Sequence, residues 1–375
     1  MPCCFECRVE LTINNRTREH ILLNAIGGRL VSENLYCRHC NSSYGHECDS
    51  ELAKQLSQIS SFLQVKRDHG EHPPIKNVIG TSGTKYVLEG GFKAKLAFPT
   101  VRLTRTEDGY TVNGQADGKE MQKILQTIKE RNPDFDLEDA LKNVKEAPPF
   151  SEPLQMPEIS MNGNLINRAI LKSALNFYLH HGGDVNLVNH LHPFLTEEVL
   201  TPVVYGFPLQ DHPYDVQPNE IYHILHLVAN RAEQILYVYV EFFSSFSYVV
   251  ILSDNYSGED YQKTYSYEVI TGEERNNKIT VNLTRSFESD LNERLKDQTA
   301  IIEKRLSKIF HIGAWIHLDN AYFKIKTDLS EQLEKLHQEG KFIPLNLVVA
   351  YGQAIQRWGK HQKAKTEPGF PFFEI

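Results

Sequence analysis

The sequence lacks several features that define other classes of protein. Its first 30 residues carry charges throughout and contain no apolar stretch, so we expect no secretory signal peptide. The most apolar run, Ile235 to Leu252, is interrupted by Glu241 and by serines, which excludes a membrane span and predicts two strands. No internal repeat or low-complexity tract is present. We therefore expect an ordinary globular protein of the cytoplasm, with no membrane partner.

An excess of positive charge is also missing. The chain has 40 Lys and Arg against 48 Asp and Glu, a formal net charge of −8, which excludes a generally basic surface. Residues 1 to 70 are balanced, so any affinity of this region for nucleic acid must come from a local patch. The arginines that could form such a patch are Arg16, Arg18, Arg29 and Arg38.

Cysteine is scarce, but its spacing is informative. Four of the six cysteines form two Cys-x-x-Cys pairs, Cys4 with Cys7 and Cys37 with Cys40. Two such pairs can place four thiolates around one Zn²⁺ in a closed tetrahedral site, and a closed site is structural. Disulfides or buried free thiols are the alternatives, and they are disfavoured because a chain without a secretory signal keeps its cysteines reduced.

Four polar residues lie between the cysteine pairs and just after them, in an order that resembles a known family. Glu19-His20 lies between the pairs, Asn34 lies in SENLYC, and Asn41 follows Cys40. In this order and spacing the segment resembles the zinc-stapled HNH endonucleases, which have a ββα-metal fold. The resemblance covers about the first 65 residues. It implies that His20 is the general base, that Glu19 and Asn41 bind a catalytic divalent ion, and that Asn34 orients the loop of His20.

The residue types suit the implied chemistry. A neutral imidazole can accept a proton from water at neutral pH, and a bound metal can neutralise charge on a phosphodiester. The family's third histidine is Asn41 here, so the ligands are oxygens only, which favours Mg²⁺ or Mn²⁺. Each residue also has a plain structural interpretation: a strand histidine is often structural, and Asn41 could cap the next helix.

Three regions are expected along the chain: an HNH module over 1–68, a small α+β domain over 72–148, and a larger α+β domain over 149–375. A hairpin is expected over 21–35, a polar turn over 41–45 and a helix over 47–65, whose apolar face carries Leu52, Leu56, Ile59 and Leu63. Asp108-Gly109 predicts a second hairpin. Further helices are expected near 119–131, 137–144, 165–181, 287–309, 328–340 and 345–361, and strands over 221–271.

The second half is also rich in histidine. Seven of its histidines cluster between residues 180 and 226, and their spacing fits no metal-ligand motif known to us: His180, His181, His190, His192, His212, His223 and His226. We interpret His223 and His226, which lie in an apolar strand, as packed or exposed strand residues.

The sequence therefore predicts an α+β protein whose N-terminal ββα-metal module is an endonuclease. The resemblance implies a substrate of double-stranded DNA, a bacterial or phage setting in defence or mobile elements, and a C-terminal region that selects the target or meets a protein partner or signal ligand. The alternatives are a non-catalytic zinc finger that binds nucleic acid and an enzyme that cuts RNA.

Overall fold

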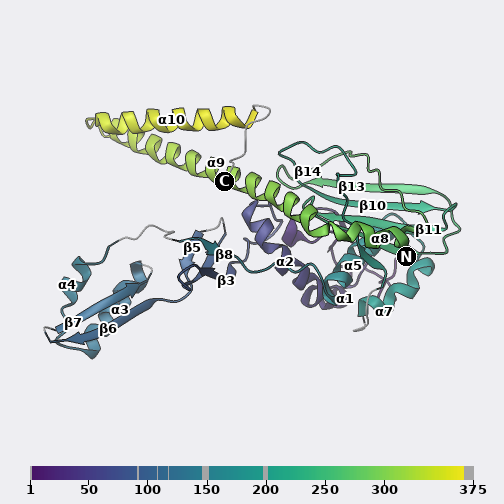
Figure 1. The fold of residues 1–375 in the computed structure, drawn as a ribbon, viewed down its shortest axis with the longest axis horizontal. Helices are drawn as coiled ribbons and strands as arrows, with labels where there is room; N and C mark the ends of the chain where they lie inside the picture. Colours follow the sequence, from purple (N-terminus) through teal and green to yellow (C-terminus); the bar gives the residue numbers. More distant parts are fainter. Residues whose placement is uncertain are drawn as a thin grey trace.

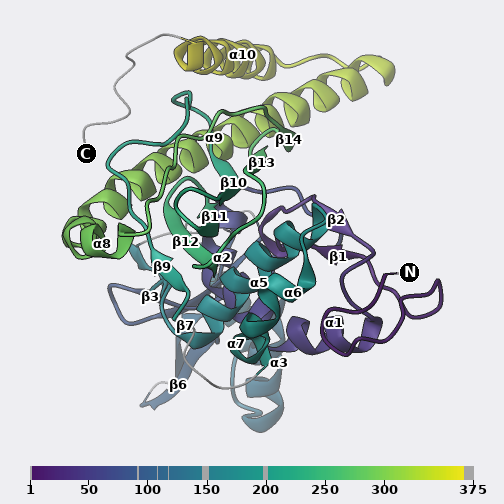
Figure 2. The same ribbon diagram turned by 90° about the vertical axis from the view of Figure 1, so that its right-hand side faces the viewer.

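The computed structural model of the chain describes residues 2–90, 93–107, 109–116, 118–145, 152–196 and 202–366. Over these residues the protein is a mixture of helices and antiparallel sheets, which confirms the expected α+β class. Figures 1 and 2 show a compact body with two projections: a small β-rich part and a helical hairpin.

The N-terminal module is a short hairpin followed by two helices. Its elements are β1 Glu19–His20, η1 Asn24–Ile26, β2 Val31–Ser32, α1 Arg38–His46 and α2 Cys48–Phe62. The expected polar turn over 41–45 is wrong, because α1 begins directly after Cys37 and runs through these residues. The expected apolar face of the next helix is confirmed, since Leu52, Leu56 and Ile59 of α2 are buried.

The middle of the chain contains a four-stranded and a two-stranded sheet. The elements are β3 Ile75–Gly80, β4 Lys85–Glu89, β5 Lys93–Leu96, β6 Thr100–Thr106, β7 Gly109–Gln115, α3 Gly118–Arg131, α4 Leu137–Lys142 and β8 Leu154–Gln155. The order β5-β4-β3-β8 brings the chain back to β3 after α4. The predicted hairpin is confirmed by the pairing of Thr106 with Gly109; Asp108 lies outside the described residues.

Four helices among the described residues immediately precede the strands of the larger sheet in the sequence. They are α5 Asn164–His180, α6 Val185–Val188, η2 Asn189–Leu191 and α7 His192–Thr196. The strands are β9 Val204–Gly206, β10 Tyr222–Asn230, β11 Ile235–Phe242, β12 Phe246–Ser253, β13 Tyr261–Glu268 and β14 Glu273–Glu274. They form one antiparallel sheet in the order β14-β13-β10-β11-β12-β9.

The last helices differ from the expectation. One helix was expected to end near Ile309 and another to begin near Asp328, whereas the structure has α8 Phe287–Lys296, a continuous α9 Gln298–Gln338 and α10 Leu345–Thr366. Helix α9 continues through Gly313, where the Phe62 ring packs against the helix in the space that a side chain would occupy. It ends before Gly340, whose φ of 61° is left-handed. Figure 1 shows α10 folding back along α9.

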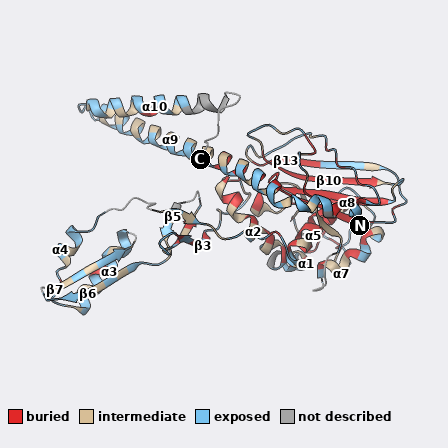
Figure 3. Cartoon of the chain, viewed as in Figure 1, coloured by how far each residue is buried: buried red, intermediate tan, exposed pale blue. Residues whose placement is uncertain are grey.

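A single hydrophobic core joins the N-terminal module to the larger sheet. Leu52 and Leu56 of α2, Leu171 and Leu175 of α5 and Leu225 of β10 belong to the same buried cluster. Helix α5 contacts both α2 and the strands β10, β11 and β12. Figure 3 shows burial concentrated in these elements, while β6 and β7 are largely exposed. The N-terminal module is therefore packed into the body of the protein.

The expectation that His223 is packed is confirmed by its contacts. Its side chain is fully buried on β10, its Nε2 bonds the carbonyl of Ile26 at 2.9 Å, and its Nδ1 accepts from the Phe243 N–H at 3.2 Å. This pattern is that of a neutral imidazole that donates from Nε2 and accepts at Nδ1. Burial lowers the pKa of His223 to about 4. His223 thus ties the loop of the N-terminal module to the larger sheet.

We expect stability to depend on pH through His223. Because its pKa is lower in the folded protein, its contribution is full above pH 6.5 and is lost as pH falls through 6.5 towards 4, by about 3 kcal/mol in total. Urea unfolding at several pH values should therefore show a smaller loss of unfolding free energy on acidification in His223→Gln than in the unmodified protein. His190→Gln, which changes an exposed histidine, is the control. An unchanged pH dependence in His223→Gln would contradict the assignment.

Candidate active site

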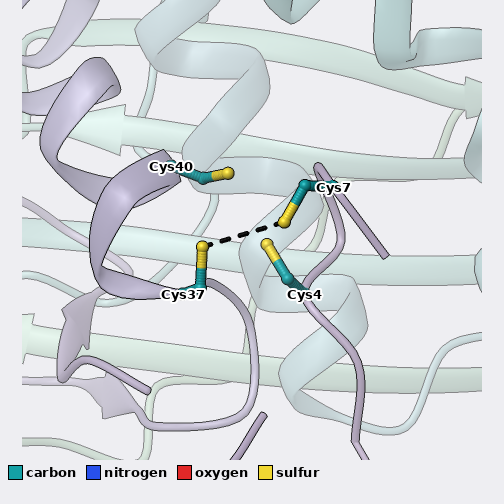
Figure 4. A group of neighbouring side chains, drawn as sticks. All are labelled: Cys4, Cys7, Cys37 and Cys40. Atoms are coloured by element: carbon teal, nitrogen blue, oxygen red, sulfur yellow. Dashed lines mark hydrogen bonds between the residues drawn. The ribbon is translucent and has the colours of Figure 1, made fainter. Parts of the chain in front are cut away.

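Four cysteine thiols meet at one end of the N-terminal module. Cys4 and Cys7 come from the first loop and Cys37 and Cys40 from the start of α1, and their Sγ atoms all lie within 4.8 Å of one another. Figure 4 shows the four side chains pointing to a common centre, with Cys7 and Cys37 Sγ at 3.8 Å. Cys3 and Cys48 lie outside this cluster.

Local backbone geometry produces this arrangement. Arg8 adopts a left-handed φ of 62°, so the chain turns sharply after Cys7, and the Cys4 N–H bonds the Val9 carbonyl across the turn at 2.8 Å. On the other side, Cys37 precedes α1, and the first helical turn brings Cys40 round to the same centre. The Phe5 N–H, which donates to the Leu35 carbonyl, holds the two loops together.

The cluster fits a zinc ion. Zn–S bonds of about 2.3 Å in a tetrahedron place neighbouring sulfurs roughly 3.8 Å apart, which is the separation of Cys7 and Cys37. Since all four positions are cysteine thiols, the geometry matches a closed structural site. The predicted ligand residues are therefore together in space.

Glu19 and His20 lie side by side on β1, but their side chains meet different partners. The strand pairs antiparallel with β2, Glu19 opposite Ser32 and His20 opposite Val31. Successive strand residues point to opposite faces. Glu19 is buried towards α2 and α5, whereas His20 faces the segment after α2.

His20 is held by Asp68, and we name these two residues with Arg18 and Arg29 the histidine cluster. The His20 Nε2 lies 3.0 Å from the Asp68 carboxylate, Arg29 forms an ion pair with the same carboxylate, and Arg18 approaches it at 3.9 Å. The Asp68 backbone N–H donates to Asn24 Oδ1 at 2.7 Å, which fixes the position of the carboxylate. The side chain of His20 is 18% exposed.

The environment keeps the His20 imidazole neutral near pH 7. Burial lowers its pKa below the usual 6.5, and the positive charges of Arg18 and Arg29 act in the same direction. A neutral ring that donates from Nε2 to Asp68 carries its basic lone pair on Nδ1. A carboxylate partner that orients a histidine in this way is a common arrangement in general-base sites.

Glu19 lies in a second group, which we name the lysine cluster: Glu19, Asp49, Lys172 and Asn176. The Lys172 Nζ lies 2.7 Å from Glu19 Oε1 and 2.6 Å from Asp49 Oδ2, and Asn176 donates to Glu19 at 3.2 Å. Burial raises the pKa of Glu19, and the Lys172 ammonium opposes that shift. Burial alone would lower the pKa of Lys172, but Asp49 and Glu19 raise it above its ordinary value, so the ammonium stays charged.

The two asparagines differ in their surroundings. The Asn41 side chain, in the first turn of α1, forms a hydrogen bond with Glu19 that opposes the rise in its pKa. Asn34 is exposed, and its backbone N–H donates to Ser32 Oγ at 3.3 Å. The structure thus brings Asn41 to Glu19 and Asp68 to His20.

Sequence reasoning missed Asp68, Asp49 and Lys172. Asp68 lies in a polar segment after α2 that has no regular pattern, so no local signal marks it. Lys172 could have been noticed, because Arg168, Lys172 and Asn176 recur every four residues in an apolar helix. Lysine is almost never fully buried unless it is paired, which makes such a stripe a sign of a buried contact.

The N-terminal part of the chain combines a hairpin that carries an acid–histidine pair, two helices and a four-cysteine cluster. Residues 4–57 match the family model of HNH endonucleases, and the N-terminal part of the chain is an HNH domain. No curated protein and no solved structure matches the chain.

Among residues 2–90, 93–107, 109–116, 118–145, 152–196 and 202–366, no helix is both long and apolar enough to cross a bilayer.

Proposed function

We propose that the protein is an HNH endonuclease that hydrolyses phosphodiester bonds in double-stranded DNA. The observation that carries the proposal is the contact of His20 with Asp68 inside a zinc-stapled HNH domain. In this role the neutral His20 removes a proton from the attacking water, and Asp68 stabilises the imidazolium that forms.

The flanking arginines suit a phosphodiester substrate. Arg18 is more than half exposed and Arg29 about a quarter exposed, so both can approach a phosphate while they remain near His20. Guanidinium groups bind phosphate oxygens through paired N–H donors. Since the module has no net positive charge, these arginines would supply the local attraction.

The family resemblance implies a catalytic Mg²⁺ or Mn²⁺ bound by Glu19 and Asn41. The residues as they are arranged do not fit such an ion, because the Lys172 ammonium lies on the Glu19 carboxylate and Glu19 is only 5% exposed.

The rest of the chain would select the target or gate the nuclease. The proposed domains are an HNH module over 1–68, a small α+β domain over 72–148 and a larger region over 149–375 that meets DNA, a protein partner or a signal ligand. A cytoplasmic role in bacterial or phage defence, or in a mobile element, rests on the family resemblance. Asn34 would orient the loop of His20.

A substrate panel tests the proposal. Purified full-length protein, with Mg²⁺, with Mn²⁺ or with EDTA, is incubated with plasmid, linear duplex, single-stranded DNA and RNA at one salt concentration. We expect cleavage of duplex DNA, with products visible on a gel. Cleavage of RNA alone would contradict the proposed substrate, and a purified, zinc-loaded protein that cuts none of them would contradict the activity.

One observation favours a second function, a non-catalytic zinc finger that binds nucleic acid. The burial of Glu19 beneath Lys172 is a satisfied structural contact, and a binding module has no need of an open site there. Gel-shift titration separates the two functions: a finger would bind the panel and leave it intact, with an affinity that falls steeply as salt is raised.

A further inference from the structure

Three polar side chains of α5 face the HNH module in a buried row. Arg168, Lys172 and Asn176 are spaced four residues apart, so they lie on one side of the helix, and each is at most 4% exposed. Each of the three bonds a residue in the first 50 of the chain: Arg168 bonds Glu47, Lys172 bonds Glu19 and Asp49, and Asn176 bonds Glu19. Arg168 also donates to the Leu195 carbonyl, whereas the charged partners of Lys172 all belong to the HNH module.

The Lys172 ammonium occupies the centre of an acidic oxygen pocket. Two carboxylates bind it directly, and the rings of Tyr44 and Tyr36 lie 5.2 and 5.8 Å from its Nζ. A buried ammonium is costly unless it is fully paired, and here the pairing is supplied by the HNH module alone. The Tyr36 hydroxyl donates to Asn176 at 2.8 Å, which closes the network around the pocket.

The same pocket has the ligand types of a divalent-cation site. Glu19 and Asp49 supply carboxylate oxygens, the hard donors that Mg²⁺ and Mn²⁺ prefer, and the side-chain amide of Asn41 lies beside Glu19. A metal ion bonded to Glu19 at about 2.1 Å would lie beside the ammonium, and the two positive charges would repel each other strongly in a buried site. The ammonium and the metal ion therefore exclude each other.

We propose that Lys172 takes the position of the divalent cation, so that a cation supplied by α5 holds the HNH domain of this chain in a metal-free state. The inference concerns the site of the function proposed above, but it stands on the lysine cluster, and its test requires no cleavage. Because α5 also packs on the larger sheet, metal binding at Glu19 is coupled to the docking of the C-terminal half.

The test compares Mn²⁺ binding by zinc-loaded full-length protein and by Lys172→Met, using the electron paramagnetic resonance signal of free Mn²⁺. Methionine fills a similar volume without charge, leaving two carboxylates and one amide. We expect Lys172→Met to bind one Mn²⁺ at the pocket, at least ~10-fold more tightly than the unmodified protein, because the competing charge is gone. Mn²⁺ should also raise the melting temperature of Lys172→Met and not that of the unmodified protein.

Two further variants control the result. Lys54→Met removes an exposed lysine of α2 and should leave Mn²⁺ binding as in the unmodified protein. Adding Glu19→Gln to Lys172→Met should abolish the new binding. Equal Mn²⁺ affinity in the unmodified protein and in Lys172→Met would overturn the proposal, and so would the absence of binding in both.

Lys172→Met leaves two buried carboxylates together without a counter-charge, which disfavours folding. If the zinc-loaded variant does not fold without added Mn²⁺, Mn²⁺ should restore its fold, because the metal ion would replace the missing charge. If Mn²⁺ fails to do so, the double variant Lys172→Met/Asp49→Asn, which keeps one carboxylate, decides by the same titration. A folded double variant that binds Mn²⁺ supports the proposal, and one that does not overturns it.

Discussion

His20→Ala is expected to lower the rate of DNA cleavage by ~10²–10⁴-fold, the usual contribution of a general base. The protein should remain folded, because Asp68 keeps its ion pair with Arg29 and its bond to Asn24 when the imidazole is removed. Zinc content and melting temperature should therefore stay close to those of the unmodified protein. The measurement is the initial rate of plasmid cleavage with each protein at equal concentration.

The matched control is His39→Ala. His39 is an exposed histidine of α1 in the same domain, so its loss should leave the cleavage rate unchanged. If His20→Ala cuts within a few fold of the unmodified protein, His20 is not the base, and an active site must be sought in the C-terminal half.

Cys4→Ser is expected to have the largest effect on folding. Cys4 is fully buried, and loss of one thiolate breaks a four-ligand site whose metal binding is coupled directly to folding. Structural zinc sites contribute apparent binding free energies of ~10–16 kcal/mol, so the loops around Phe5 and Leu35 should lose their fixed structure. Elemental analysis should give one zinc per chain in the unmodified protein and much less in the variant, with a lower melting temperature.

Cys3→Ser provides the comparison, because Cys3 precedes Cys4 and lies outside the cluster. This variant should keep its zinc and its melting temperature. Chelation of zinc from the unmodified protein should reproduce the effect of Cys4→Ser. A folded protein that contains no zinc would show that the four thiols hold no metal.

The features that depend on residues close together in the sequence could be predicted. Paired cysteine spacing identified the cluster, and the apolar face of α2 identified which side of that helix is buried. The hairpin of β6 and β7 was visible in its turn residues. The course of α9 was not visible, because its packing involves distant parts of the chain: the Phe62 ring that packs on Gly313 lies about 250 residues earlier.

The contacts around the candidate site could not be predicted either, because they join residues far apart in the sequence. Glu19 and His20 were found from their order in the motif, but their partners are separated from them by long stretches of chain. Asp68 lies in a segment with no regular periodicity, and Lys172 lies on a helix of another region. A motif specifies which residue types are present, whereas burial and charge pairing at each residue depend on packing that spans the sequence.

The dependence of Glu19 on Lys172 also bears on how the chain folds during synthesis. The HNH domain leaves the ribosome before α5 and β10, at a time when Lys172 is not there to neutralise its acidic pocket and the Ile26 carbonyl has no His223 N–H to accept from. Contacts between residues so distant in sequence close late and slowly. We expect the nascent domain to bind zinc early and to complete its core only after α5 and β10 have emerged. The N-terminal domain would then finish folding by packing against the second half of the chain.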